Sequence, residues 1–495
     1  MDLSISCIFW LVFTLVWVMA LSFISRGRRK RLPPGPRPYP VIGNLLELGG
    51  KPHESLAKLA QIYGPIMSLR LGQVTTIVVS SPSMAKAILQ NHDLSFCDRK
   101  VPEAIMSKTY RRNEFSLVWM PVSALWKNLR KICNTHIFTN QKLDANQDLR
   151  RNKIKDLLAY VEENCRAGKA IDVGQAAFNT SLNLLSNTIF SIDLVNPKER
   201  EFKNIVCRIM EQAGKPNLSD HFPLLKVLDM QGIRRRSTLY AGKMLKVLDR
   251  LVDQRLEQRQ EHGCRIITEC KDILDTLLNI IQDKSVEIDT KNIKHLFADL
   301  FIAGNDTISI TVEWAMAELL HNPEALLKAK LELEQTVGKG NLVEESDITR
   351  LPYLQAVIKE TFRLHPAAPL LIPRKASKDV NIVGFTVPKG AQVFVNIWAI
   401  GRDESTWDNP HSFMPERFLG SKVDFKGQNF ELIPFGAGRR ICPGLPLAIR
   451  MLHLMLGSLI NSFDWKLEGE NMDMEEKFGL TIQKAQPLYV VPVAI

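Results

Sequence analysis

The chain has 495 residues, 45% of them hydrophobic and 24% charged, which are ordinary values for a globular protein with a large core. We find no internal repeat, low-complexity segment or long linker, so one large domain is the better interpretation of this length. The formal net charge of +11 comes without a nucleic-acid-binding motif, so we expect no nucleic-acid partner. Eight irregularly spaced cysteines without a CxxC pair argue against a disulfide framework and against zinc, and fit a reducing compartment.

The amino terminus indicates a membrane anchor. Residues 3–24 are almost wholly apolar and uncharged, and a helix of this length spans a bilayer. The basic run Arg26–Arg31 follows the apolar stretch, which favours a lumenal amino terminus and a cytosolic remainder. A cleaved signal peptide has the opposite charge order and a shorter core. Residues 25–43 include five prolines between Leu32 and Gly43 and predict a basic, proline-rich hinge.

Residues 44–495 form the main domain, where helical patterns outnumber strand patterns. Two apolar runs at 66–80 flank Gly72-Gln73 and predict a β-hairpin. Further short strands are expected at 380–387, at 392–397 and near Thr481 and Tyr489. Helices are expected at 83–90, at 126–138, over 148–259 except for a loop at 216–223, at 291–320, at 353–364 and after Cys442. The pattern predicts a mainly α fold of the α+β kind, helix-rich with a small β portion.

The segment Phe435-Gly-Ala-Gly-Arg-Arg-Ile-Cys-Pro-Gly444 places a single cysteine in a tight turn. Its glycines permit backbone angles closed to other residues, and Pro443 fixes the backbone after Cys442. Free N–H groups and two neighbouring arginines favour the thiolate, which is the metal-binding form. One thiolate alone does not make a zinc site but suits haem iron, whose other ligands come from the porphyrin. The alternative is a buried, inert cysteine beside a glycine turn.

The spacing Phe-x-x-Gly-x-Arg-x-Cys-x-Gly in this segment resembles the haem-binding signature of the cytochrome P-450 superfamily, and the proline-rich hinge resembles that of its plant microsomal members. The resemblance implies a cytochrome P-450 fold and haem b bound through Cys442, with Phe435 and Arg440 beside it. It implies an NADPH- and O₂-dependent monooxygenase. It also implies a single-pass protein of the endoplasmic reticulum membrane, in contact with lipid, whose cytosolic domain takes electrons from NADPH–cytochrome P-450 reductase.

The helix expected at 291–320 carries Ala303-Gly-Asn-Asp-Thr307, whose polar groups are costly inside an apolar helix. The motif resembles the superfamily's (A/G)Gx(D/E)T(T/S) signature. The resemblance implies that Gly304 leaves room for O₂, that Thr307 hydrogen-bonds the bound oxygen and that Asp306 relays protons. We expect the helix to widen locally and admit water. Ile308 stands where many plant members carry a second hydroxyl. The alternative is a helix kink or an N-capping Asp-Thr pair.

Glu360-Thr-Phe-Arg363 puts a carboxylate and a guanidinium on one helical face, a pattern that is usually a solvated surface pair. Together with Arg417 it resembles the superfamily's ExxR pair completed by an arginine. The resemblance implies a structural role behind the haem. His365, at the end of the same helix, is expected to cap or pack that end and not to bind iron.

Trp126-Lys-Asn-Leu-Arg130 offers an indole N–H and a guanidinium one helical turn apart, and both donors suit carboxylates. The resemblance implies that Trp126 and Arg130 hold a haem propionate, with Arg374 and Arg440 as further candidate partners. Basic residues around Trp126 and in the Cys442 loop would also face the acidic electron donor. A generic basic surface is the alternative.

Several segments, among them Leu143-Asp-Ala-Asn-Gln and Met474-Glu-Glu-Lys-Phe-Gly-Leu, resemble the plant group that hydroxylates acyclic monoterpene alcohols such as geraniol. The resemblance implies a small lipophilic terpenoid substrate, bound by apolar burial, with few polar groups to orient its hydroxyl. The candidate pocket residues come from four segments: Val122, Phe301, Ala303, Leu371, Ile372, Leu480 and Thr481.

Other hypotheses stay open at this point. Pocket residues decide the substrate, and apolar fit discriminates only modestly, so a diterpene or another plant metabolite is an alternative substrate. From another class, a membrane-anchored haem protein could bind a ligand without turnover, or the fold could isomerise or dehydrate without O₂. The Asp306-Thr307 pair argues against both, because neither needs a proton relay.

Overall fold

The computed structural model describes residues 6, 9–10, 13–14, 17, 31–106, 112–195, 201–261, 270–284, 286–469 and 472–495. Six positions of the predicted anchor at 3–24 are described, and they are helical and exposed; the other anchor residues, and 25–30 of the predicted hinge, lie outside the described residues. Hinge residues 31–43 contain no helix. The carbonyls of Pro33 and Pro34 accept hydrogen bonds from Ser68 (2.6 and 2.8 Å), so this part of the hinge lies against the first strand of the main domain.

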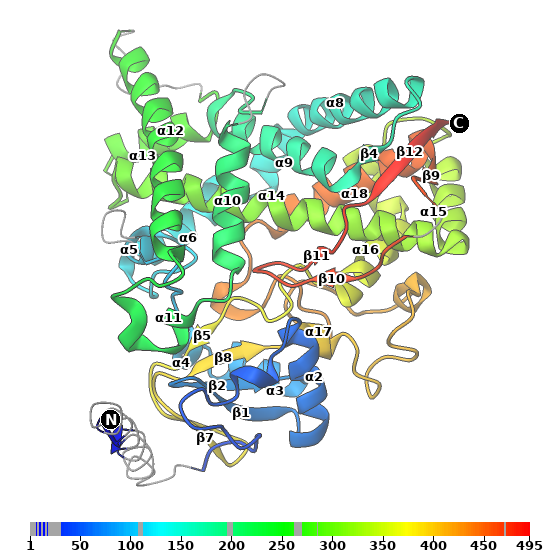
Figure 1. The fold of residues 1–495 in the computed structure, drawn as a ribbon. Coiled ribbons are helices and arrows are strands. Elements are labelled where there is room, and N and C mark those ends of the chain that lie inside the picture. The colour runs from blue at the N-terminus through cyan, green and yellow to red at the C-terminus, as the bar shows by residue number, and fades with distance from the viewer. Residues whose placement is uncertain are drawn as a thin grey trace.

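Helices dominate the described chain, and Figure 1 shows α14 crossing the middle of the molecule. In the first half of the chain the helices are α2 (Pro52–Tyr63), α3 (Pro82–Lys86), η2 (Ala87–Asn91), α4 (Asp93–Phe96), α5 (Arg112–Phe115), α6 (Ala124–Ile132), η3 (Cys133–Ile137), α7 (Asn140–Ala145), α8 (Gln147–Arg166), α9 (Val173–Phe190), α10 (Glu201–Gly214), α11 (Leu218–His221) and α12 (Ile233–Glu261). In the second half they are α13 (Ile273–Gln282), α14 (Thr290–His321), α15 (Pro323–Thr336), α16 (Pro352–Leu364), α17 (Ile397–Ile400), η6 (Pro415–Phe418), η7 (Gly438–Arg440) and α18 (Leu445–Ser462).

The long helix α14 is the centre of the helical core. It begins with a capping box in which the Asp289 carboxylate accepts from the Asn292 N–H and the Asn292 side chain accepts from the Asp289 N–H. Helices α9, α12, α16 and α18 pack against it. Among the described residues, α18 alone is long and apolar enough to cross a membrane, but most of it is buried inside the protein. An apolar helix in that position is a core helix.

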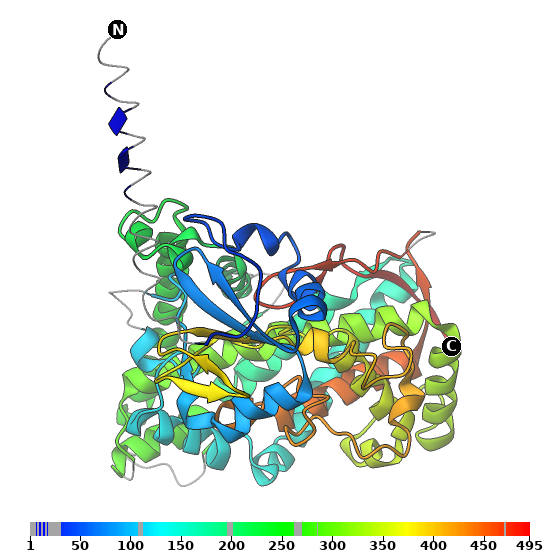
Figure 2. The ribbon, with the colours of Figure 1, turned by 90° about the horizontal axis from the view of Figure 1, so that it is seen from below.

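Figures 1 and 2 show the largest sheet at one side of the helical part and the sheet that contains the C-terminal strand well away from it. The largest sheet has the order β1 (Ile66–Leu71), β2 (Val74–Val79), β8 (Gln392–Val395), β5 (Arg374–Lys375) and β3 (Asp98–Arg99). A second sheet has the order β4 (Ile171–Asp172), β12 (Tyr489–Ala494) and β9 (Phe463–Leu467). Two short hairpins are β6 (Val380–Ile382) with β7 (Phe385–Val387) and β10 (Glu476–Lys477) with β11 (Gln483–Lys484).

The prediction of a mainly α fold with a small β portion is confirmed. The hairpin expected at 66–80 is β1–β2, and the helices expected at 291–320 and after Cys442 are α14 and α18. The prediction of one strand at 380–387 is wrong, because the chain reverses at Val383 (φ +49°) and Gly384 (φ +77°) and forms the hairpin β6–β7. Gly384 adopts this left-handed conformation without steric cost. The prediction of a single apolar strand did not take this glycine into account.

Candidate active site

The Cys442 loop lies between η7 and the start of α18. Gly438 has a φ of +69°, and a Cβ atom there would lie 2.1 Å from the Leu89 carbonyl oxygen, so only glycine fits. The Cys442 N–H donates to the Phe435 carbonyl (3.0 Å) and closes the loop. Phe435 itself packs edge-on against Phe362 of α16, with ring centroids 5.3 Å apart. The loop is therefore anchored to the core on both sides of the cysteine.

Cys442 is accessible to solvent even though protein surrounds its loop. Burial raises the pKa of its thiol, while the Gly444 and Leu445 N–H groups and the nearby Arg130 charge act in the opposite direction. The N–H donors expected from the sequence are present, but the charge that acts on the thiol comes from Arg130 and not from the neighbouring Arg439 and Arg440, which bind Asp93 and backbone carbonyls. In the protein alone these donors do not outweigh burial. A metal cation would, because a coordinating thiol is deprotonated outright. A thiol that is both accessible and enclosed faces an internal space and not the outer surface.

A second accessible patch lies in the middle of α14. Ala303 is exposed, and Gly304 and Thr307 are half-buried, whereas Phe301 and Asn305 on the same helix are fully buried. An exposed alanine inside a core helix indicates an internal space beside it. Helix α14 packs against α18, which begins three residues after Cys442. The fold therefore puts the predicted oxygen-binding motif and the predicted ligand cysteine on neighbouring elements of the core.

Helix α14 does not widen at this motif, contrary to our expectation. It is α-helical from Thr290 to His321, and Thr307 Oγ1 donates to the Ala303 carbonyl (2.9 Å). A Cβ atom on Gly304 would lie 2.8 Å from Leu185 Cδ1 of α9. Close packing between α9 and α14 is therefore a further reason for glycine at this position, beside the room expected for O₂.

Asp306 is buried and points at the β10–β11 hairpin. Its carboxylate accepts hydrogen bonds from Thr481 Oγ1 (2.5 Å) and Gln483 Nε2 (3.4 Å). Burial raises the pKa of Asp306, and these two hydrogen bonds act in the opposite direction. Gln483 was not predicted from the sequence, because it belongs to no motif and lies far along the chain. Thr481, expected only as a pocket residue, is here a partner of the carboxyl group assigned to proton relay.

Three guanidinium groups gather near the Cys442 loop with no carboxylate within ion-pair distance in the described part of the chain. Arg99 of β3 is paired with Arg374 of β5, and Arg440 belongs to η7. Their donors go to backbone carbonyls: Arg99 to Ile372 (2.6 Å), Arg374 to Phe96 and Ala437 (both 3.3 Å), and Arg440 to Cys97 (2.9 Å), Leu117 (3.0 Å) and Met120 (2.5 Å). Arg99 was missed by the sequence analysis because it belongs to no recognisable motif.

This cluster fits a ligand that carries carboxylates. Burial lowers the pKa of Arg374 and of Arg440 to about 10, and it lowers the pKa of Arg99 as well. The Nε atoms of Arg99 and Arg374 are buried without a hydrogen-bond partner among the described residues. Asp93 and Asp98 act on Arg374 and Arg440 only from beyond ion-pair distance. A buried cation without a close counter-charge is costly, so an anion that enters beside these arginines is favoured. The two propionates of haem have the required charge.

Trp126 and Arg130 lie on α6 at the edge of the same region. The Trp126 indole N–H donates to the Leu117 carbonyl (3.0 Å), and its ring lies 4.8 Å from the Arg440 guanidinium carbon. Arg130 Nη1 donates to the Ile441 carbonyl, next to the cysteine (2.6 Å). Arg130 therefore contacts the backbone of the Cys442 loop, and a propionate contact for it and for Trp126 stays a prediction.

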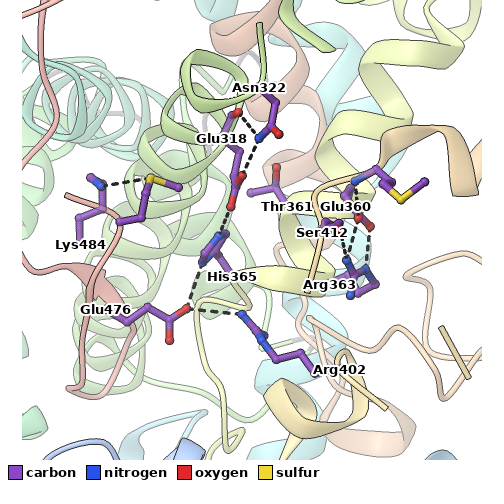
Figure 3. Close-up of polar contacts among 12 residues, drawn as sticks. Glu318, Asn322, Glu360, Thr361, Arg363, His365, Arg402, Ser412, Glu476 and Lys484 are labelled. Atoms are coloured by element: carbon purple, nitrogen blue, oxygen red, sulfur yellow. Dashed lines mark hydrogen bonds and ion pairs between the residues drawn. The ribbon is translucent and has the colours of Figure 1, made fainter. Parts of the chain in front are cut away.

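The structure brings Glu360, Arg363 and Arg417 together in the core behind this region. Arg363 binds both Glu360 oxygens (2.7 Å each), and Arg417 Nε binds one of them (3.0 Å). The remaining Arg363 donors go to the carbonyls of three residues, Gly401, Pro410 and Ser412. Figure 3 shows Glu360, Arg363 and Ser412 of this cluster beside a second buried chain of polar groups. Unlike the surface pair that the pattern alone suggests, Glu360 and Arg363 are fully buried.

The candidate pocket residues are not all placed alike. Ala303 is exposed and Leu480 is half-buried. Val122 and Ile372 are half-buried, and Leu371 lies 3.9 Å from the Cβ position of Gly436 in the Cys442 loop. Phe301 is the exception, because it is completely buried between Phe190 and Phe202, with ring centroids 6.1 and 5.0 Å away. Phe301 is therefore a core residue in this structure and not a pocket-lining one.

An accessible thiol in an anchored loop, an exposed Ala303 on the neighbouring core helix and buried arginines without a close carboxylate fit a haem-thiolate protein. Comparison with known families agrees: the Cytochrome P-450 family matches residues 33–491, and the chain belongs to that family. Members of this family are monooxygenases that bind haem through a cysteine thiolate. They require O₂ and a redox partner, so the protein is an oxidoreductase of this type.

The chain is also similar over its whole length to characterised plant enzymes. It is 55% identical to geraniol 8-hydroxylase of Catharanthus roseus, with 99% of each chain covered. It is 54% identical to geraniol 8-hydroxylase of Swertia mussotii (97% of each chain) and 53% identical to drimenol monooxygenase of Persicaria hydropiper (96% of this chain and 95% of the relative).

Proposed function

We propose that this protein is a haem b monooxygenase that hydroxylates a small terpenoid alcohol, with geraniol oxidised at carbon 8 as the first candidate reaction. The observation that carries the catalytic part is the accessible Cys442 thiol together with Arg99, Arg374 and Arg440, which have no carboxylate within ion-pair distance in the described chain. The substrate part is supported by similarity to two geraniol 8-hydroxylases over nearly the whole chain.

The residues divide the work of holding the cofactor. Cys442 would supply the sulfur ligand, and the three arginines would receive the propionates. Haem bound in this way would supply electron transfer and O₂ activation. The hydrogen bonds that join Glu360 to Arg363 and Arg417 would hold the segment after α16 in place behind the Cys442 loop. The family resemblance adds Trp126 and Arg130 as further propionate partners.

Residues of α14 would serve the other side of the cofactor. The Thr307 hydroxyl, which donates to the Ala303 carbonyl here, would turn to offer its proton on the side of α14 that faces the cofactor. Asp306 would pass protons inward; burial raises the pKa of its carboxyl group, while the hydrogen bonds from Thr481 and Gln483 act in the opposite direction. Exposed Ala303 would leave an apolar surface for the substrate. Binding would come mainly from apolar burial, at about 25 cal/mol per Å².

Membrane attachment belongs to the same proposal. Residues 3–24 would anchor the protein in the endoplasmic reticulum membrane and residues 25–43 would connect the anchor to a cytosolic catalytic domain. The electron donor would be NADPH–cytochrome P-450 reductase. In support, the hinge residues that the structure describes lie along the main domain and not apart from it, so the domain would sit close to the membrane.

The test is expression with a plant reductase in microsomes, with geraniol and NADPH supplied and products analysed by mass spectrometry. We expect 8-hydroxygeraniol from the parent and none from Cys442→Ala. The matched control is Cys165→Ala, which removes a half-buried thiol on α8 and should leave the product unchanged.

Each outcome of this test separates the proposals. A reduced-CO band of a thiolate-bound haem without product would keep the cofactor and reject geraniol. Drimenol would then be tried first, because a drimenol monooxygenase is similarly close in sequence, followed by diterpenes. A haem band with no NADPH consumption for any substrate would favour the non-catalytic haem protein.

A further inference from the structure

The hairpin β10–β11 contacts α14 at two widely separated points. Its tip, residues 478–482, reaches Asp306 through Thr481, and its base reaches Glu318 through Glu476 and His365. Asp306 and Glu318 are twelve positions apart on one helix, a distance of about 18 Å along its axis. Figure 1 shows the hairpin running below α14 along this stretch.

The tip of the hairpin joins the pocket segments to the carboxyl group of Asp306. Thr481 Oγ1 and Gln483 Nε2 are the side-chain donors that Asp306 receives among the described residues. The Ile482 N–H donates to the Ala367 carbonyl (2.9 Å), which leads into the segment with Leu371. Leu480, between these contacts, is half-buried and was expected to touch the substrate. One short loop therefore carries both a pocket side chain and the partners of Asp306.

The base of the hairpin is held by Glu476, which is buried. Its carboxylate receives His53 Nε2 (2.9 Å), His365 Nδ1 (3.0 Å) and the Trp398 indole N–H (3.1 Å). Arg402 lies 3.8 Å away and completes the surrounding positive charge. These four partners come from α2, the end of α16, α17 and the loop after it. Figure 3 shows Glu476 between His365 and Arg402.

His365 connects this base to α14. Its Nε2 lies 2.7 Å from Glu318 Oε1 and its Nδ1 lies 3.0 Å from Glu476 Oε1. Both ring nitrogens therefore lie within hydrogen-bond distance of a carboxylate, one on α14 and one on the hairpin. The ring also stacks flat on Trp314 of α14, with centroids 3.8 Å apart and planes 1° from parallel.

We propose that the β10–β11 hairpin is the positioning element of the proton relay: Thr481 and Gln483 orient the Asp306 carboxyl group, and the His365–Glu476 pair clamps the hairpin to α14. The proposal rests on the proton-relay role given to Asp306 in the proposed function. It adds that a substrate pressing on Leu480 acts on the same loop that holds Asp306. Substrate binding and proton delivery are therefore mechanically coupled through the hairpin.

The tip is tested with Thr481→Val, which keeps the shape of the side chain and removes its hydroxyl, against Thr481→Ser, which restores it. In the holoenzyme with reductase and a turned-over substrate, Thr481→Val should lower product formed per NADPH consumed by about tenfold, because general acid–base assistance is worth at least that much. It should also raise the solvent deuterium isotope effect. Thr481→Ser should return both to near the parent values. Equal product per NADPH in Thr481→Val and the parent would overturn the role of the tip.

Infrared spectroscopy of the Asp306 carboxyl group tests the same role of Thr481 without catalytic turnover. The infrared carboxyl band that disappears in Asp306→Asn belongs to Asp306, and Thr481→Val should shift it because a hydrogen bond to the carboxyl group is lost. A merely structural role of Thr481 in the pocket would leave this band unchanged. If the parent makes no product from geraniol, the substrate proposal fails, while the infrared band still decides whether the tip orients Asp306.

The base is tested with His365→Gln and with the milder Trp398→Phe, which removes one donor to Glu476. Lys477→Ala, exposed on the same hairpin, is the matched control. The hydrogen–deuterium exchange rate of the backbone amides at 472–495 should rise several-fold in both variants and stay unchanged in the control. Product formed per NADPH consumed should fall in both variants, and it should fall most in the variant whose amides exchange fastest. If His365→Gln does not fold, Trp398→Phe carries the test. Faster exchange without loss of product per NADPH would show a clamp that does not act on Asp306 and would overturn the proposal.

Discussion

Two groups of buried arginines lie in the core of this protein, and they are built in opposite ways. Arg363 and Arg417 share the Glu360 carboxylate, and every donor of Arg363 has a partner. Arg374 and Arg440 have carbonyl partners only, and Arg374 keeps an unsatisfied Nε atom. The first group is complete within the chain. The second has Asp93 and Asp98 in its neighbourhood but no carboxylate within ion-pair distance in the described chain, and a carboxylate ligand would supply that close partner.

The difference shows how a buried charge can be used. A compensated network stabilises the fold by itself, and removing one partner leaves the other buried and unpaired. A cluster of cations without close carboxylates lowers the stability of the ligand-free fold. When an anionic ligand binds, the stability that was lost is recovered as part of the binding free energy. We therefore expect variants of the first group to change folding and variants of the second to change cofactor retention.

The largest effect is expected for Arg363→Gln. It leaves the buried Glu360 carboxylate with too few donors, which costs about 3–5 kcal/mol, so the protein should accumulate unfolded with or without haem. The matched control is Arg350→Gln. Arg350 also pairs with an acid three residues away, Asp347, but its side chain is 59% exposed, so the loss should be at most about 1 kcal/mol. Thermal unfolding of both variants measures the two losses of stability. Equal losses would remove the contrast between buried and exposed pairs.

A smaller effect of another kind is expected for Arg374→Gln. Haem retention should fall by about tenfold or more, since a hydrogen bond to a charged group contributes about 1.5–3 kcal/mol. The haem-free protein should melt at the same or a higher temperature, because an uncompensated charge is gone. Arg439→Gln, at an exposed neighbour paired with Asp93, should change neither quantity. A destabilised haem-free Arg374→Gln protein would show that Arg374 is structural, like Arg363.

The smallest effect is a pH dependence at Glu476, which belongs with the compensated networks. Burial raises the pKa of Glu476, but hydrogen bonds from His365 and His53 outweigh it and hold the pKa well below the ordinary 4.5. A lowered folded pKa contributes stability that is complete above pH 4.5 and is lost as the pH falls further. The melting temperature of Glu476→Gln should therefore lie below that of the parent at pH 7, by a few degrees. The gap should shrink at pH 4, and a constant gap between the two pH values would contradict this assignment.

The sequence predicted the helical class, the β1–β2 hairpin and the tight turn around Cys442 because each has a local cause. Helical periodicity predicts α14, and Gly436, Gly438 and Pro443 permit only a tight turn around Cys442. The local signals failed where a turn is short or where a side chain has no periodic pattern. The reversal at Val383-Gly384 was read as a continuous strand, and Phe301 was read as a pocket residue.

Tertiary structure alone decided which distant residues meet. Nothing near Arg99 in the sequence indicates that it joins Arg374 and Arg440, since β3 and β5 pair across more than half of the chain. Nor does local sequence indicate that Thr481 and Gln483 hold Asp306, or that His365 stands between two carboxylates. Burial raises the energy of each of these polar groups until a partner is found, and the partners come from whichever segments the packing of the core brings alongside. The motifs therefore determined the chemistry of this protein, and the packed fold determined how that chemistry is held in place.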